Sequence, residues 1–173
     1  MRLLITGIVT LFLVSITPTQ HQAGAPGEIR GLLYLDGTQS IQMRDTAASR
    51  RSRWGVVAAS KQYFVFEGPR ATLRVKTTTP AFQFDADPSF DDPVYLFRFD
   101  RKSDRREITV ASGFGGLANF SLPKDHIIET SLEEISKGPD STHRYRMKPV
   151  APLRPGEYCI SRNFSVCFDF GVD

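Results

Sequence analysis

Apolar and polar residues alternate with a period of two along much of this chain, and no stretch keeps the period of a helix. Alternation of this kind predicts β-strands that turn one face toward a core. The clearest example is residues 94–99, where three aromatic residues alternate with Val94, Leu96 and Arg98. We expect this strand to be central in its sheet.

The other predicted strands are separated by turn-forming residues. The dipeptide Asp36-Gly37 lies between two such runs and predicts a tight hairpin turn. We expect strands at 29–35, 38–43, 54–59, 62–67, 70–76, 81–84, 107–111, 117–120 and 144–150, a basic loop at 44–53, and either a strand or a short helix at 126–135. About ten strands at this spacing are typical of a sandwich or barrel. We predict an all-β fold, a single antiparallel β-sandwich of Greek-key or immunoglobulin-like type with little helix.

The first residues form an apolar run, residues 3–16, behind the single cation Arg2. This is the pattern of a signal peptide, and the run is shorter than the roughly 20 residues that a membrane-spanning helix needs. We therefore expect residues 1–25 to be removed on export and residues 26–173 to form one domain. The expected product is secreted or periplasmic and has no stable membrane span.

The charges are nearly balanced, with 22 Lys and Arg against 19 Asp and Glu and a net charge of +3. Such a balance predicts no particular polyanionic partner. Nucleic acid is not expected as a partner, because its binding needs a wide basic face and the protein is expected to be exported.

Two cysteines, Cys159 and Cys167, lie within one predicted C-terminal hairpin. In an oxidising compartment they are expected to form a structural disulfide that contributes about 2 to 3 kcal/mol. No histidine is near enough in the sequence to make them a zinc site.

The register of this hairpin follows from its turn residues. We expect Ile160 to lie opposite Val166, with a five-residue loop around Asn163, a residue that tolerates the left-handed conformation. A three-residue loop would require a positive φ at Phe164, so the longer loop is preferred.

Just before this hairpin, the residues Leu153, Pro155, Gly156 and Tyr158 form the pattern Leu-x-Pro-Gly-x-Tyr. The pattern resembles the tyrosine corner of Greek-key sandwiches, in which the phenol bonds to upstream backbone. Together with the segments 168–172, 31–37 and 104–107, it also resembles uncharacterised exported bacterial β-sandwich proteins. That resemblance implies a fold and a compartment, and it carries over no activity and no site.

One acidic segment, residues 85–92, is the best candidate for a metal site. Its carboxylates Asp85, Asp87, Asp91 and Asp92 are the oxygen ligands that calcium prefers. The spacing does not match an EF-hand, so the alternative is a solvated loop that ends a strand. No other cofactor is expected.

A basic segment and three aromatic residues are the candidates for ligand binding. Three closely spaced cations beside an indole ring could hold a phosphate or a sulfated sugar, or form a solvated loop. Most aromatic rings are expected in the core, because Phe residues recur in pairs with a period of two. The residues singled out are Arg50, Arg51, Arg53, Trp54, Tyr34 and Tyr63.

No catalytic residue is assigned. The chain has no nucleophile elbow, and His126 and His143 are each expected at the surface. A glycosidase would need two carboxylates that meet across a sheet, and the acidic segment, Asp100 and Glu107 leave that alternative open. Whether the protein is an enzyme stays open, and we lean against it.

Three hypotheses follow. The leading one is a non-enzymatic exported protein that binds a macromolecule, either a protein or a glycan. The alternatives are a polysaccharide hydrolase with paired carboxylates and a structural subunit that pairs through an edge strand.

Overall fold

The computed structural model describes residues 29–54, 59–87, 93–114, 117–120, 124–137 and 142–173. The signal-peptide prediction, residues 1–25, lies outside this part. The described residues contain sixteen strands and no helix, so the all-β prediction is confirmed, with more and shorter strands than the expected ten. Among these residues no helix is long and apolar enough to cross a membrane.

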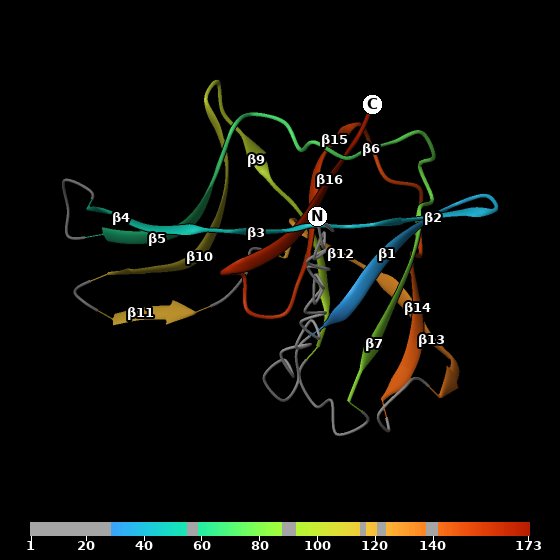
Figure 1. Cartoon of the computed structure of the whole chain (residues 1–173). Coiled ribbons are helices and arrows are strands. Elements are labelled where there is room, and N and C mark those ends of the chain that lie inside the picture. The colour runs from blue at the N-terminus through green and yellow to red at the C-terminus, as the bar shows by residue number, and fades with distance from the viewer. Residues whose placement is uncertain (1–28, 55–58, 88–92, 115–116, 121–123, 138–141) are drawn as a thin grey trace, which may run out of the picture.

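The strands form three sheets, which are antiparallel except for one short parallel pairing (Figure 1). Sheet A has the order β13 (Thr130–Lys137), β14 (His143–Pro149), β7 (Ala81–Ala86), β1 (Arg30–Asp36) and β2 (Gln39–Gln42). Sheet B has the order β12 (Ile127–Ile128), β8 (Tyr95–Arg98), β15 (Gly156–Ser161), β16 (Val166–Val172) and β3 (Asp45–Ala47), and β6 (Arg74–Val75) runs parallel to β16. Sheet C has the order β11 (Leu117–Phe120), β10 (Arg105–Phe114), β5 (Ala59–Glu67) and β4 (Ser49–Trp54), and β9 (Asp100–Arg101) pairs with β10.

Sheet B lies in the middle and is buried on both faces. In β15, the side chains of Tyr158 and Ile160 pack with sheet A, while Cys159 belongs to a second core shared with sheet C. The side chains of the neighbouring strand β8 alternate between the two cores in the same way, with Leu96 in the first core and Phe97 in the second. The strand predicted at residues 94–99 is β8, which has a paired strand on both edges, the short β12 and β15.

Sheets B and C are joined because the chain passes directly from one into the other at two bends. At Ala48, β3 becomes β4, and the backbone N–H of Ala48 donates to the carbonyl of Ser165 at 2.8 Å. At Phe99, β8 becomes β9, and the N–H of Phe99 donates to the carbonyl of Glu157 at 2.9 Å. The pairings thus follow a closed ring through β4, β5, β10, β9–β8, β15, β16 and β3, which encloses the second core.

The basic segment 44–53 forms strands β3 and β4, so the prediction of a loop there is wrong. The backbone of β4 pairs with β5, with Arg51 opposite Tyr63. The side chains of Ser49 to Arg53 are all exposed. An edge strand that is exposed to solvent on both faces shows no alternation of apolar and polar residues. Its sequence therefore resembles that of a loop. The sequence of residues 126–135 is compatible with either a strand or a short helix. In the structure these residues lie mainly in β12 and β13.

The C-terminal hairpin forms the expected disulfide in an unexpected register. Ile160 pairs with Phe168, two residues beyond the predicted partner Val166. Cys159 and Cys167 are therefore diagonal neighbours on one face of the hairpin, and their Cα atoms are 5.7 Å apart.

The conformation of the loop between β15 and β16 explains this register. Phe164 has a φ of 59°, the conformation that the predicted register was meant to avoid. Its ring packs against Tyr95 and Phe97, with centroid distances of 5.2 and 5.7 Å. The carboxamide oxygen of Asn163 accepts the backbone N–H groups of Ser165 and Val166. Burial of a phenyl ring offsets the roughly 1 to 2 kcal/mol that a left-handed residue costs.

The Leu-x-Pro-Gly-x-Tyr segment has the hydrogen bond that a tyrosine corner requires. The hydroxyl of Tyr158 donates to the carbonyl of Arg154 at 2.6 Å, and the ring is buried against Phe170. Leu153 is buried too, and its N–H donates to the carbonyl of Thr78 at 2.7 Å. The corner therefore ties the start of β15 to the loop before β7.

Removal of this hydroxyl should measurably destabilise the fold. We expect Tyr158→Phe to lower the free energy of unfolding by about 1 to 2 kcal/mol in a urea titration at neutral pH. Burial raises the pKa of the Tyr158 phenol, so its contribution is present below pH about 10 and is lost as the pH rises through the raised pKa. Equal stability of variant and wild type at neutral pH would show that the corner bond is dispensable.

Candidate functional site

An open pocket lies at one end of the ring of strands, where β9 and β15 begin and β16 ends. Its volume is about 660 Å³. The pocket, called the arginine pocket below, is lined by Arg70, Arg74, Arg98, Phe99, Asp100, Arg101, Asp125, His126, Pro155, Gly156, Glu157, Val172 and Asp173. Four guanidinium groups and four carboxylates therefore meet at a surface that β8, β9, β15, β16 and the segment around β6 provide.

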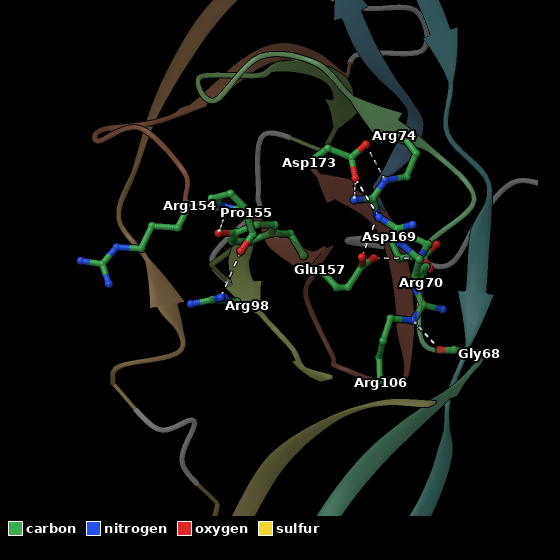
Figure 2. A network of polar contacts seen from close by, with 12 residues as sticks. Gly68, Arg70, Arg74, Arg98, Arg106, Arg154, Pro155, Glu157, Asp169 and Asp173 are labelled. Carbon is green, nitrogen blue, oxygen red and sulfur yellow. Dashed lines mark hydrogen bonds and ion pairs between the residues drawn. The ribbon is translucent and has the colours of Figure 1, made fainter. Parts of the chain in front are cut away.

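Arg74 is held by carboxylates at two depths (Figure 2). Its Nη1 donates to Oε1 of Glu157 at 2.7 Å, and its Nη2 donates to Oδ1 of Asp173 at 2.5 Å. The hydrogen bond with Asp173 is the main cause that raises the pKa of Arg74, and the same bond lowers the pKa of Asp173. The guanidinium lies over Gly171, where any Cβ atom would overlap it. Arg74 is thus fixed in position before a ligand arrives.

Glu157 is the buried anchor of this arrangement. Its side chain is only 2% exposed, yet both carboxylate oxygens have donors. Oε1 accepts from Arg74, and Oε2 accepts the backbone N–H of Ala71 at 2.7 Å. A buried carboxylate with these partners holds the segment around β6 against β15.

Arg98 forms the opposite wall of the pocket (Figure 2). Its Nη2 donates to the carbonyl of Pro155 at 3.1 Å, and its guanidinium lies over Gly156, where a Cβ atom would come within 2.9 Å of Nε. Neither Arg98 nor Arg101 forms an ion pair with a described residue, and both side chains are exposed. These two guanidinium groups are available for an anionic group.

His126 lies on the third side of the pocket. Its Nδ1 lies 2.8 Å from the carbonyl oxygen of Arg98, which orients the ring. Its Nε2 lies 3.9 Å from Asp100 and 3.8 Å from Asp125. Two of the four carboxylates, those of Asp100 and Asp125, thus lie near the histidine, whereas those of Glu157 and Asp173 contact Arg74.

A second buried ion pair supports this end of the ring from within. Arg106 and Asp169 form an ion pair inside the second core, with the Arg106 side chain 3% exposed. Arg106 also donates to the carbonyls of Glu67 and Gly68, each at 3.1 Å, and Asp169 accepts from the hydroxyl of Thr46 at 3.2 Å. This pair joins β10, β16, β3 and the end of β5 beneath the arginine pocket.

The arginine side chains of the pocket have the donors needed to hold an anionic group. Guanidinium groups bind carboxylates, sulfates and phosphates through paired N–H donors. No known protein family, curated protein or solved structure matches this chain. The assignment of a ligand therefore depends on the residues themselves.

Two of the three aromatic candidates for ligand binding, Tyr34 and Tyr63, are buried in the interior, so their rings are not open to a ligand. Tyr34 is buried in the core beside Phe82, and burial raises the pKa of its phenol. Tyr63 is also buried, and the Arg53 guanidinium covers its ring at 5.5 Å from the centroid. Trp54 ends β4 opposite Ser60, and its side chain is not among those described. No open aromatic face is formed by Tyr34 or Tyr63.

The basic candidates Arg50, Arg51 and Arg53 lie along β4, at a distance in sequence and fold from the arginine pocket. Arg50 donates to the side chain of Gln62 on the neighbouring strand. Arg53 lies opposite Lys61 of β5, on the same face of the sheet as Arg51, and Arg50 lies on the other face. Arg50, Arg51 and Arg53 therefore belong to a basic edge strand of sheet C and do not line the arginine pocket.

The acidic candidates do not form a metal centre in the described part of the chain. Asp85 lies in β7, where Arg144 donates to both of its carboxylate oxygens at 2.7 and 3.0 Å. Asp87 follows β7 and is exposed, while Asp91 and Asp92 lie outside the described residues. No group of three potential metal ligands occurs among the residues that are described. The bidentate arginine gives the Asp85 carboxylate a structural role.

Asp100 and Glu107 do face each other in the register of β9 and β10. The two oxygens of Glu107 are engaged, one by Arg105 at 3.0 Å and the other by Lys102 at 3.5 Å. Of these two carboxylates, that of Asp100 lines the arginine pocket and that of Glu107 does not. His143, the other predicted surface histidine, lies 3.0 Å from Glu134 in sheet A. Asp100 and Glu107 therefore do not form a pair of free carboxylates in one cleft.

Sequence reasoning missed the arginines of the pocket. Arg70, Arg74, Arg98 and Arg101 are spread over three separate segments, and each looks like an ordinary surface cation in its own context. One signal was present at Glu157. The period of two places this residue on the same face as Cys159, and a carboxylate on a buried face requires a cationic partner.

Proposed function

We propose that the protein is exported and that it acts as a non-enzymatic binding protein, which recognises acidic groups of a macromolecule at the arginine pocket. The single observation that carries the proposal is the pair Arg98 and Arg101. Both guanidinium groups line an open pocket of about 660 Å³ and have no carboxylate partner among the described residues. Groups of this kind bind a carboxylate or sulfate in a fixed orientation.

The way in which the pocket is built supports binding rather than a chance cluster of surface charges. Arg74 and Arg98 each lie over a glycine, and Arg74 is anchored by the buried Glu157. Flexible surface arginines lose side-chain entropy when they bind, whereas a guanidinium held in advance loses less. A ligand therefore meets one guanidinium, that of Arg98, whose position the carbonyl of Pro155 and the close approach to Gly156 already determine.

Export is supported by two features of the chain. The apolar run at residues 3–16 is typical of a signal peptide, and Cys159 and Cys167 form a disulfide. Disulfides persist mainly in oxidising compartments. A partner outside the cytoplasm follows from this proposal.

The edge-strand alternative receives little support from the sheets. The longest described edge strand of sheet A, β13, carries Glu133, Glu134 and Lys137, and its register is irregular between Glu134 and Ser136. Charges and bulges on an edge strand hinder pairing with another chain. The opposite edge, β2, has only four residues.

A thermal-shift experiment tests the proposal. The oxidised protein is melted with poly-L-glutamate, polygalacturonate, heparin and neutral dextran, because a ligand that binds the native state raises the melting temperature. We expect a rise with at least one acidic polymer and none with dextran. The rise should be lost in Arg98→Gln and in Arg101→Gln.

The control variant is Arg146→Gln, which removes an arginine of sheet A that lies 3.9 Å from Glu133, remote from the pocket. It should keep the full response, because a general attraction between charges would be weakened equally by each of these substitutions. No response to any acidic polymer, or an equal loss in all three variants, would contradict the proposal.

A further inference from the structure

A second, smaller pocket adjoins the arginine pocket. Its volume is about 310 Å³, and it shares Arg98 and Asp125 with its neighbour. The remaining lining residues are Ile127, Ile128, Glu129, Val150, Ala151, Pro152, Leu153, Arg154 and Tyr158. Most of these are apolar, so this space is called the apolar pocket below. The two pockets share a wall and are together called the groove below, with the arginine pocket as its charged half and the apolar pocket as its apolar half.

The apolar pocket is lined by hydrophobic side chains that are exposed to solvent. Val150 is 60% exposed and Ile127 is 37% exposed, and they are two of the four large hydrophobic residues that are exposed in the described part of the chain. Ile127 lies on β12, the edge strand of sheet B, so no further strand of that sheet covers it, and Val150 directly follows β14 of sheet A. Exposed apolar side chains that gather beside a polar rim are typical of a contact surface for a partner.

Charge complementarity indicates what kind of partner fits. Arg98 stands at the boundary of the two pockets, with Arg101 on one side and Arg154 on the other. None of the three has an ion-pair partner among the described residues, and all three are exposed. A partner that places an acidic group beside an apolar group would satisfy both halves of the groove.

The aromatic residues of the groove argue against a sugar ring in the apolar half. Tyr158 is the aromatic residue of the apolar pocket and Phe99 that of the arginine pocket, and both are buried. A sugar would find no open aromatic face to stack on. The alkyl groups of Val150, Ile127 and Pro152 instead match an aliphatic amino-acid side chain.

We propose that the groove binds an extended segment of a partner protein. One apolar side chain of that segment fills the apolar pocket, and a carboxylate close to it in sequence binds Arg98 and Arg101. This inference rests on the proposed function, because it uses the same arginines. It goes further by naming the class of partner and a second set of contacts, which no acidic polysaccharide would use.

Selection from a random peptide library on the oxidised protein tests this inference without knowledge of the natural partner. We expect enrichment of peptides in which an aliphatic residue lies within a few positions of Asp or Glu. A selected peptide is then titrated against variants. Val150→Ser should weaken binding about tenfold, as expected when one aliphatic side chain no longer contacts its partner.

The control for this variant is Ile41→Ser. Ile41 is 38% exposed, similar to Ile127, but it lies on β2 in sheet A. It should leave peptide binding unchanged. Because Val150 is mostly exposed, its substitution should not unfold the protein, and Ile127→Ser provides a second variant on the same pocket.

The outcomes separate this inference from the proposed function. If acidic polymers raise the melting temperature through Arg98 while no peptide is enriched, or while Val150→Ser and Ile127→Ser bind peptide as well as wild type, the partner is an acidic glycan or another polyanion and the inference is overturned. If neither polymers nor peptides bind, both proposals fail. Enrichment of acidic and aliphatic peptides that need both Arg98 and Val150 supports both.

Discussion

Asp169→Ala should lower the free energy of unfolding by about 3 to 5 kcal/mol, which is among the largest effects expected for any charged residue of this protein. The substitution leaves the buried guanidinium of Arg106 without its carboxylate inside the second core. The two backbone carbonyls that also accept from Arg106, those of Glu67 and Gly68, cannot neutralise its charge. Urea denaturation at neutral pH measures the change.

A double variant separates the lost ion pair from general disruption of the core. Arg106→Met combined with Asp169→Leu removes both charges together, and we expect it to be more stable than Asp169→Ala alone. If Asp169→Ala stays within about 1 kcal/mol of wild type, the pair is exposed to water and does not close this end of the ring.

The second large effect is expected at Glu157, the buried carboxylate of the arginine pocket. We expect Glu157→Gln to lower the free energy of unfolding by about 3 kcal/mol, because a neutral amide weakens the bonds to Arg74 and to the N–H of Ala71. Arg74 then loses its deeper anchor, so the response to acidic polymers should weaken as well. Denaturation and the thermal-shift panel measure the two consequences on the same sample.

The control is Asp173→Asn, which alters the other carboxylate that Arg74 contacts. Asp173 is 61% exposed, so its loss should change stability little at neutral pH. Arg74 lowers the pKa of Asp173, so the contribution of this carboxylate is present above pH about 3.8 and disappears as the pH falls through the lowered pKa. Equal effects of the two substitutions would contradict a special role for the buried carboxylate.

The strands could be predicted from the sequence because burial on one or two faces leaves a pattern of its own. The strand predicted at residues 94–99, β8, has a paired strand on both of its edges, and Tyr158 forms the expected bond with backbone. The edge strand β4 was not predicted, because all its described side chains are exposed. Without a buried face there is no alternation to detect.

The register of the C-terminal hairpin and the arginine pocket could not be predicted for a different reason. The ring of Phe164 stabilises a left-handed residue by packing on Tyr95 and Phe97, which are far away in sequence. The pocket likewise depends on contacts between distant segments, such as that of Arg74 with Glu157. Local sequence patterns report local propensity and burial, and they carry little information on which distant side chains meet.

The central claim is that acidic groups bind at the arginine pocket, and the location of binding tests it most directly. Poly-L-glutamate is titrated into isotopically labelled protein, and NMR shift changes are followed at the backbone amides and arginine Nε groups. The account predicts that the largest changes occur at Arg98, Arg101 and Gly156. Changes confined to Arg50, Arg51 and Arg53 on β4 would contradict it, because binding would then take place at the basic edge strand and not in the pocket.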